Sequence, residues 1–510
     1  MGKDKRVSPG KKDHRENNPT PALRESVGIK GASGTNRGRD AAFDLAQYVV
    51  NTAYADLPGE LVEMTKRCIL DTLGVTIAAS TLDAAAKEIV ELIKEGGGKQ
   101  ESTILGFGGK LPCWMAAFVN GAMGHMVDYD DMHMMGKIHS GVTTVLPGLA
   151  IAERIGKVTG RDFIAAVALG NDIMVRLGRA ITLSPQGRDE WTMDKGWFST
   201  QLFGFISGAA TVGKLLKLSE EQMIDAFGIA FAQLSGSRQM GTGFAAETRA
   251  IQAAWTGKGA VLSALLAKRG ITGSRDSFEG KYGLYRVYLQ ADPDRDSLVG
   301  ALGRRFDGMR MQFKPWPACG ATHPVIYSTL EIMREHGLKA KDVEEVRIVG
   351  GSPHTRLLSE PIESKRQPKT AIDGKYSIPF TVAIAVAKGN VTLHDYTPEG
   401  LNDPTVLKIA QRITYHYVPE VAGKREEESP VVEIRVSNGA LYRRQDEIIY
   451  GMPEKAVSGE DLMVKFKDCL SFSAIPIRDE DAVRAADMIG KLETIPDVSQ
   501  VIDLLGGSAS

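Results

Sequence analysis

From residue 41 to about residue 310, apolar side chains recur almost without interruption at spacings of three and four residues. This spacing is what an amphipathic helix requires. The pattern predicts helices at 41–58, 58–80, 83–95, 111–128, 144–156, 161–181, 196–218, 219–236 and 247–270. Ser219 and Gln222 have the spacing of a capping box at the start of one of them. This part of the chain therefore predicts a large all-helical body.

The pattern changes after residue 310. Two segments, 343–352 and 431–439, alternate apolar and polar residues as half-buried strands do, and helical segments at 323–337 and 377–390 lie beside them in sequence. Helical spacing returns at 458–470 and 478–495. We therefore expect a mainly α protein with a smaller α+β domain. The expected divisions are a disordered tail at 1–40, a helical domain from 41–310 and 455–506, and the α+β domain at 311–454.

Composition excludes several broad classes of protein. A formal net charge of -1 gives no reason to expect nucleic acid or an anionic membrane as a partner. An apolar content of 43% and a charged content of 25% are ordinary for a soluble globular protein, and no apolar run is long enough to span a bilayer. The four cysteines are widely scattered, so we expect a reducing compartment, the cytoplasm, and no disulfide framework.

The segment 120–154 concentrates polar side chains between two predicted helices. Its middle is rich in Met and Gly and lacks a clean apolar period, so it predicts a loop that carries polar groups into a cleft. It holds three histidines and three aspartates, His125, His133, His139, Asp128, Asp130 and Asp131. These groups can accept, donate or orient a proton, but a capped turn is an equally good interpretation of the aspartates. The spacing matches no common metal motif, so no metal is expected.

Three other polar clusters leave alternatives open. Arg249 begins a predicted helix, where a cation is unfavourable. We therefore expect its charge to pair with either a structural carboxylate or an anionic ligand. Lys314 precedes a Pro-rich crossover and a helix that begins at His323, which is either an anion site or an exposed lysine. Cys319 lies between them, and sequence alone does not give it a base. The third cluster, 364–380, is interpreted as a plain helix start.

Taken together, these motifs resemble the MmgE/PrpD family. The order is 70-LDTLGVTIAAS, NG…HMVDYDD…HSG…LPGLAIAER, LLKLSEEQMIDAFGIA, KPWPACGATHP and KYSIPFTVAIAVAKGNVTL. The resemblance covers about residues 41–506. The family includes 2-methylcitrate dehydratase, cis-aconitate decarboxylase and iminodisuccinate epimerase. The resemblance implies a helical domain in two sequence pieces, an α+β lid, a homodimer, and no metal or organic cofactor.

The resemblance also implies roles for single residues. The acidic motif falls on Asp128, Tyr129, Asp130 and Asp131, with His125 before it and the active-site histidine at His139. Substrate-binding positions fall on Arg249 and Lys314. The chain departs from the family at five further positions. Met132 stands where members have Thr. Members have His at the positions of Phe198, Gln252 and Cys319, and the decarboxylase has a Tyr at the position of Phe380. Losing the polar groups at 198, 252 and 380 predicts a more apolar pocket, which argues against cis-aconitate as the substrate.

The implied activity is that of a lyase acting next to a carboxylate, with dehydration or hydration of a small carboxylic acid as the first hypothesis. Arg249 and Lys314 are expected to bind carboxylates, and His139 to move the proton. Asp128 either takes the proton or orients His139. His125 and Asp131 are expected to assist, Asp130 to cap a helix, and His133 to take no part. Decarboxylation, epimerisation and a non-catalytic ligand-binding role are the alternatives.

Overall fold

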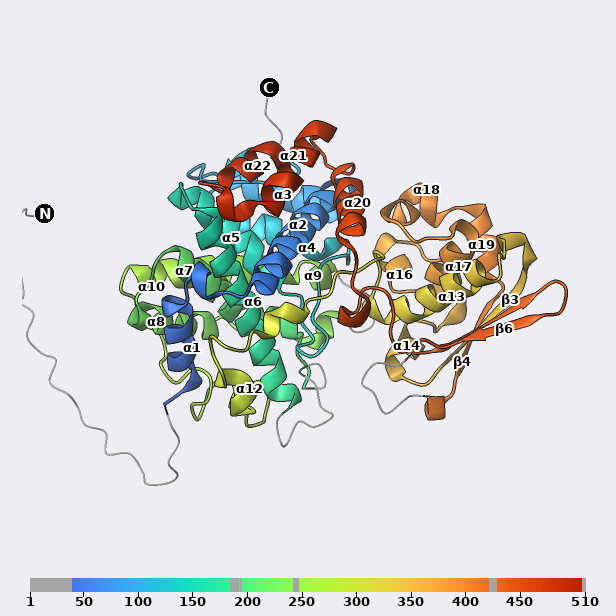
Figure 1. Ribbon diagram of the computed structural model, residues 1–510, viewed down its shortest axis with the longest axis horizontal. Coiled ribbons are helices and arrows are strands. Elements are labelled where there is room, and N and C mark those ends of the chain that lie inside the picture. Colours follow the sequence, from blue (N-terminus) through green and yellow to red (C-terminus); the bar gives the residue numbers. More distant parts are fainter. Residues whose placement is uncertain (1–38, 184–191, 193–194, 242–246, 422–428, 507–510) are drawn as a thin grey trace, which may run out of the picture. The chain divides into compact units, whose positions relative to one another are not determined.

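The computed structural model describes residues 39–183, 192, 195–241, 247–421 and 429–506 (Figure 1). The tail predicted to be disordered therefore lies almost entirely outside the described residues. The helices before residue 300 are α1 Ala41–Asn51, α2 Gly59–Leu82, α3 Ala84–Glu95, α4 Cys113–Met126, α5 Gly141–Ile155, α6 Gly160–Thr182, α7 Ser199–Leu215, α8 Glu220–Phe231, α9 Glu247–Ala250, α10 Gln252–Lys268, α11 Leu284–Val287 and α12 Arg295–Val299. The mainly helical prediction for this region is confirmed.

Two predicted helices end or break at residues that the apolar pattern did not indicate. The first ends at Asn51, because the Asp56 carboxylate accepts a hydrogen bond from the backbone N–H of Ala53 and holds a separate 3-10 turn. The helix predicted over 247–270 is divided at Ile251 into α9 and α10. At Ser219 the predicted capping box is present, with Gln222 as its partner. The apolar spacing therefore located these helices but not every helix end.

Small residues bring α4 and α10 into close contact. A Cβ added at Gly121 of α4 would lie 2.6 Å from the carbonyl oxygen of Ala253. One added at Gly257 of α10 would lie 2.6 Å from the carbonyl oxygen of Ala117. Any side chain at either position would push the two backbones apart. This packing places the C-terminal turn of α4, which carries His125, next to the segment that carries Arg249.

The last helices return to the first ones. Figure 1 shows α20 Gly459–Leu470, α21 Asp479–Gly490 and α22 Ser499–Leu505 beside α2, α3 and α5. At Gly74 of α2, an added Cβ would lie 3.1 Å from the ring of Phe466 on α20. A single apolar cluster accordingly contains buried residues from both ends of the chain, from Ala41 to Phe313 and from Val457 to Leu505.

The α+β part is built on a four-stranded sheet in the order β4-β3-β5-β6. Its strands are β3 Val343–Gly350, β4 Ile413–Tyr417, β5 Val431–Val436 and β6 Leu441–Arg444. β3 pairs in parallel with β4 and antiparallel with β5. The sequence predicted β3 and β5 but missed β4 and β6, since only Ile413 is buried in β4 and no residue is buried in β6. Edge strands of this kind carry little apolar alternation.

Seven α-helices belong to the same part of the described chain. They are α13 His323–Glu335, α14 Pro353–Leu357, α15 Ile362–Arg366, α16 Ala371–Lys375, α17 Ile378–Lys388, α18 Pro398–Leu401 and α19 Pro404–Ala410. Of these, α13, α15 and α17 pack against the strands. A second apolar cluster runs from Trp316 to Ile449. We propose that the two clusters are the cores of two domains, with the first boundary a few residues later than 310, because Met311 and Phe313 pack in the first cluster.

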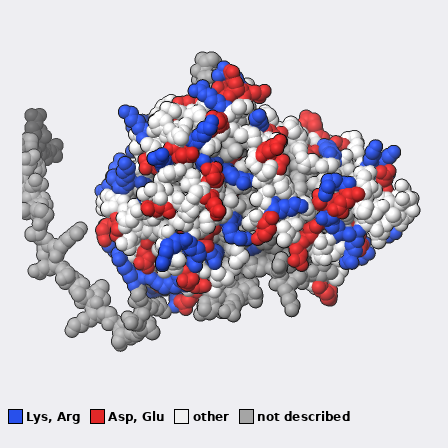
Figure 2. All heavy atoms as spheres, in the orientation of Figure 1, with Lys and Arg blue, Asp and Glu red and all other residues white. Residues whose placement is uncertain are grey.

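The surface and the helix lengths add two observations. On the face drawn in Figure 2, Lys and Arg side chains lie among Asp and Glu side chains over most of the described surface. Within the described ranges, no single helix combines the length and the apolar character that a membrane span requires. The pair Gly59–Leu82 and Ala84–Glu95 meets both conditions only when joined across a bend of 93°.

Candidate active site

Two histidines share one buried carboxylate at the end of α4. His125 lies in the last turn of that helix, and its Nδ1 is 2.9 Å from both oxygens of Asp130. Nδ1 of His139, which comes just before the N-cap residue of α5, lies 3.2 Å from Oδ2 of Asp130. The two rings meet edge to face with centroids 4.8 Å apart. Asp130 was predicted to cap a helix, and instead its fully buried side chain joins the two imidazoles.

The hydrogen bonds of His125 define its tautomer. Nη1 of Arg249 lies 2.6 Å from Nε2 of His125. A guanidinium can only donate, so Nε2 accepts and Nδ1 carries the proton towards Asp130. Burial lowers the pKa of His125 to about 4, although the charge of Asp130 works in the opposite direction. His125 is therefore neutral at pH 7. It links Asp130 to Arg249 through hydrogen bonds at its two ring nitrogens.

His139 has the opposite nitrogen free to act as a base. Its Nδ1 lies 2.8 Å from the backbone carbonyl oxygen of Asp131. A carbonyl only accepts, so Nδ1 carries the proton and Nε2 holds the basic lone pair. The backbone N–H of His139 donates to Oγ1 of Thr200 at 3.0 Å, which fixes the residue from the side of α7. The contacts of Nδ1 therefore orient the ring, and the bond to Thr200 fixes the backbone of the same residue.

Asp128 pairs with Lys314 and not with His139. Nζ of Lys314 donates to Oδ1 of Asp128 at 2.6 Å and to its carbonyl oxygen at 2.9 Å. Burial acts to raise the pKa of Asp128, but the charge of Lys314 holds it well below the usual range. Asp128 has a φ of 50°, a left-handed conformation that Asp tolerates. The expected orientation of His139 by Asp128 is thus absent, and Asp130 occupies that place.

Asp131 has the structural role that the sequence gave to Asp130. Its carboxylate accepts a hydrogen bond from the backbone N–H of Gly141 at 3.1 Å, at the N-terminus of α5. It also accepts from the thiol of Cys68 at 3.1 Å. Burial, with the charges of Asp71 and Asp130, raises the pKa of Asp131 to about 7. The capping interaction therefore exists, one residue later than predicted.

A second lysine, Lys465, also supports this loop. Nζ of Lys465, on α20, donates to the carbonyl oxygen of Tyr129 at 2.6 Å and to that of Lys314 at 3.2 Å. It also pairs with Oδ1 of Asp71 on α2 at 2.6 Å. Because Tyr129 follows Asp128 directly, Lys465 holds both backbone segments that carry the Asp128–Lys314 pair.

The expected substrate-binding residues surround Arg249 and the loop. The Arg249 guanidinium lies over the ring of Phe198, 4.5 Å from its centroid. Gln252 is buried, and neither atom of its amide has a hydrogen-bond partner among the described residues. Met132 exchanges backbone hydrogen bonds with Gln312. Met132 thus ties the acidic loop to the segment that leads into the α+β part.

Three other candidates take structural positions. Burial raises the pKa of Cys319 to about 11, so its thiol keeps its proton. His323 is a weak base, because burial lowers its pKa to about 3, and its Nε2 donates to the carbonyl oxygen of Ala318 at 3.2 Å. Phe380 is fully buried in the second apolar cluster and does not line the cavity near Asp128. In His133, Nδ1 accepts from the N–H of Gly136, which closes a turn.

A small cavity lies where these groups meet. It is lined by His125, Met126, Asp128, Arg249, Ala250, Ile372, Lys375 and Tyr376. Its volume of about 10 Å³ is close to what one water molecule needs. The sequence missed Lys375 and Tyr376, because 364–380 was interpreted as a helix start. The signal that was available is a lysine placed directly before an apolar helix, where its ammonium would be buried.

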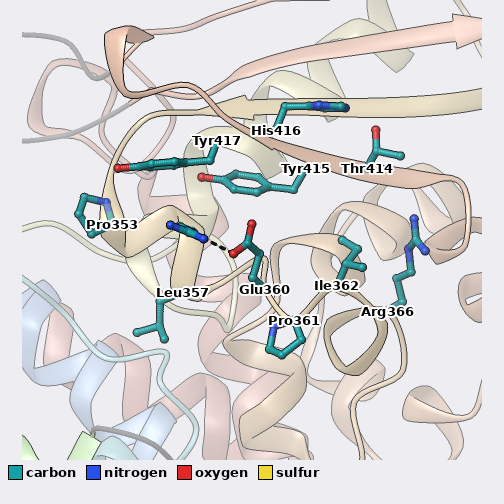
Figure 3. Close-up of a pocket in the computed structure, with 11 residues that line it drawn as sticks. Pro353, Leu357, Glu360, Pro361, Ile362, Arg366, Thr414, Tyr415, His416 and Tyr417 are labelled. Atoms are coloured by element: carbon teal, nitrogen blue, oxygen red, sulfur yellow. Dashed lines mark hydrogen bonds and ion pairs between the residues drawn. The ribbon is translucent and has the colours of Figure 1, made fainter.

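A larger cavity of about 980 Å³ lies on the α+β part (Figure 3). It runs along β4, where Tyr415 and Tyr417 project to the same side. Its arginines already have partners, since Arg356 pairs with Glu360 at 2.8 Å and Arg366 donates to the carbonyl oxygen of Ile413. It contains none of the residues predicted for the site. The smaller cavity, where acids, bases and cations converge, is the better candidate.

The His125, Asp130 and His139 side chains are also the group best placed to hold a metal. Their ligand atoms all lie within 4.8 Å of one another, and Zn²⁺ takes His and carboxylate ligands. However, the Arg249 guanidinium touches His125, and a fixed positive charge there opposes a divalent cation. The expected absence of a metal therefore stays a prediction.

Two family models match most of the sequence. Residues 43–296 match the MmgE/PrpD N-terminal domain and residues 316–488 the MmgE/PrpD C-terminal domain. A cis-aconitate decarboxylase-like protein of Aspergillus oryzae is 23% identical, over 91% of this chain and 97% of its own. Human cis-aconitate decarboxylase is 25% identical, over 88% and 91%. The 2-methylcitrate dehydratase of Cupriavidus necator is 21% identical, over 90% and 96%. The chain therefore belongs to the MmgE/PrpD family.

Proposed function

We propose that this protein is a lyase that removes water from a small carboxylic acid, by taking a proton from the carbon next to a carboxylate. The observation that carries the proposal is the His125–Asp130–His139 group beside Arg249. His125 and Arg249 line the small cavity, and His139 lies against the ring of His125 outside that lining. A basic imidazole and a fixed cation therefore lie close together, and such a pair is what the chemistry requires. The matched relatives, named as decarboxylases and dehydratases of small carboxylic acids, support the same class of reaction.

In this mechanism His139 is the base and Asp128 is not. Asp128 is a weak acceptor, because Lys314 stabilises its charged form. Nε2 of His139 takes the proton, and the resulting imidazolium is stabilised by Asp130, 3.2 Å from Nδ1. Negative charge spreads from the carbon into the substrate carboxylate, which Arg249 binds. The same proton then passes from His139 to the departing hydroxyl, which leaves as water, so that a carbon–carbon double bond remains.

The small size of the cavity supports a lid movement during each turnover. A space for one water molecule cannot hold a carboxylic acid. Of its lining residues, Ile372, Lys375 and Tyr376 come from the α+β part, and the others come from α4, α9 and the acidic loop. A substrate therefore enters only if these two walls separate. Closure over the bound acid would exclude water and strengthen the charge interactions inside.

Decarboxylation is the second candidate, and the names of the relatives favour it. The protein from Aspergillus oryzae and the human enzyme are both named for cis-aconitate decarboxylation. Loss of CO₂ leaves the same electron-rich carbon, which a protonated His139 would then protonate. Phe198 against Arg249 is the feature that disfavours a highly polar acid at this wall.

Incubation of the protein with 2-methylcitrate and, separately, with cis-aconitate distinguishes the reactions by proton NMR. A new vinyl signal with no CO₂ released supports dehydration, and CO₂ release from cis-aconitate supports decarboxylation. In deuterated water, deuterium at a stereocentre without loss of either group would show epimerisation. His139→Ala should abolish turnover and preserve the fold. Full activity in that variant would exclude His139 as the base, and binding of both acids without turnover would show a ligand-binding protein.

The resemblance supports three further parts of the proposal. We propose that the active form is a homodimer, that it needs no metal or organic cofactor, and that it works in the cytoplasm. Light scattering after gel filtration tests the first, since a mass near 55.1 kDa would mean a monomer. Activity after exhaustive dialysis tests the second.

A further inference from the structure

Lys375 is a buried lysine in the wall of the small cavity. It ends α16 and is 4% exposed. The nearest acceptor of its ammonium is the carbonyl oxygen of Met126, at 3.4 Å, which is the outer limit of a hydrogen bond. Among the described residues, no carboxylate forms an ion pair with it. The charge of Asp128 acts on Lys375, but that carboxylate is already paired with Lys314. Burying an ammonium group without an ion-pair partner of its own is costly, so this position calls for an anion.

Lys314 presents the opposite case, although both lysines lie close to Asp128. Lys314 is 2% exposed and donates twice to Asp128, at 2.6 Å and 2.9 Å. Its charge is therefore already neutralised, and it does not line the cavity. A substrate carboxylate could reach Lys314 only by displacing Asp128. Lys375 has no such ion pair to give up, since its ammonium makes one long contact with a backbone carbonyl and lies 5.8 Å from the centroid of the Tyr396 ring.

Arg249 faces the same cavity from the helical part. Within the described residues it too forms no ion pair with a carboxylate, and its guanidinium contacts His125 and the ring of Phe198. The cavity thus has one cation on each of the two walls that must separate for entry. An anion held between them would draw the walls together, since opposite charges attract strongly in a site without water.

We propose that Lys375 is a specificity-determining residue that binds a carboxylate of the substrate opposite Arg249, the role that the resemblance assigned to Lys314. This inference rests on the proposed function for the identity of the ligand. The backbone of Lys375 is held in place, because its carbonyl oxygen accepts a hydrogen bond from the N–H of Cys319 at 3.1 Å. Burial also lowers the pKa of Lys375 to about 8, and a bound anion would favour its charged form.

A structural role for Lys375 makes a different prediction. The carbonyl of Met126 belongs to the last turn of α4, where cations near the helix end are stabilising. If Lys375 served only that helix end, its loss would lower the thermal stability and leave the affinity for carboxylates unchanged in the folded protein.

The experiment measures binding by calorimetry with tricarballylate, a saturated tricarboxylate with no hydroxyl to lose, in the full chain. Lys375→Met should weaken its binding by about tenfold or more, the factor for one lost hydrogen bond to a charged group. Lys375→Arg should recover part of the affinity. The matched control is Lys408→Met, which removes the same charge from an exposed position of the α+β part and should bind as the unchanged protein does. If Lys375→Met does not fold, Lys375→Gln replaces it.

The results separate this inference from the proposed function. Equal affinity for tricarballylate in folded Lys375→Met and in the unchanged protein would overturn the role of Lys375, even if the protein turns over a carboxylic acid. Weaker binding in Lys375→Met without turnover of any acid would support Lys375 and overturn the lyase. Failure of the unchanged protein to bind or convert any carboxylate would overturn both.

Discussion

Nζ of Lys314 lies 2.6 Å from Oδ1 of Asp128, and the two residues are 186 positions apart in the chain. The pair joins the acidic loop after α4 to the segment that enters the α+β part. Lys314→Met should destabilise the protein by roughly 3–5 kcal/mol, because it leaves a buried carboxylate without its partner. Urea unfolding of the folded variant measures this loss.

A double substitution provides the control for that pair. Asp128→Asn combined with Lys314→Met removes both charges and should be more stable than Lys314→Met alone, since no isolated charge remains buried. If the double variant is as unstable as the sum of the two single variants, the ion pair is not the source of the effect.

Asp130 and Asp131 should differ in their effect on catalysis. Asp130→Asn removes the charge that stabilises protonated His139, and kcat should fall by about 10²–10⁴-fold, the usual range for proton-transfer groups. Asp131→Asn retains an oxygen that can accept from Gly141 and should lower kcat much less. Steady-state kinetics on the acid that the protein converts gives both values. A larger loss in Asp131→Asn would restore the roles first expected from the sequence.

Asp131 should also make stability depend on pH. Its pKa is about 7 in the folded protein and 3.8 ordinarily. The folded state therefore keeps a proton that the unfolded chain loses between these values, so this contribution is complete below about pH 4 and is lost as the pH rises to 7. Asp131→Asn cannot ionise. Its stability relative to the unchanged protein should rise between pH 5 and pH 8 by at least about 1 kcal/mol, the equivalent of somewhat less than one pKa unit.

Denaturant unfolding at several pH values tests this expectation. The difference between the two proteins should increase steadily with pH. Asp503→Asn, a change on α22 far from this loop in sequence, is the comparison that should show no such trend. A constant difference between Asp131→Asn and the unchanged protein would mean that Asp131 does not titrate in this range.

Chelation tests the His125–Asp130–His139 group as a metal site. We expect activity to survive dialysis against EDTA, because the fixed charge of Arg249 touches His125, and elemental analysis to find less than one metal ion per chain. Loss of activity on chelation, with recovery on adding Zn²⁺, would reverse the assignment of the cluster. In that case Arg249→Gln should tighten metal binding.

The periodic helices, the position of the acidic loop and the family could all be predicted from the sequence. Apolar spacing records which face of a helix is buried, so α2, α6 and α20 were located well. The partners inside the loop could not be predicted. Which of Asp128, Asp130 and Asp131 meets a histidine depends on the left-handed turn at Asp128 and on Lys314, which is distant in sequence. Lys375 was missed for a similar reason, since a short-range pattern does not show that an ammonium group is buried.

The contacts of Lys465 have a consequence for the order in which the protein is made. Translation delivers Asp71 and Asp128 early, whereas the lysines that pair with them, Lys465 and Lys314, follow 394 and 186 residues later. Until α20 leaves the ribosome, the nascent chain holds its acidic loop without the hydrogen bonds that Lys465 donates to Tyr129 and Lys314. A chain halted before residue 465 should therefore bury its first helices but fail to form the active site. Chaperones that bind nascent chains would bind this incomplete form.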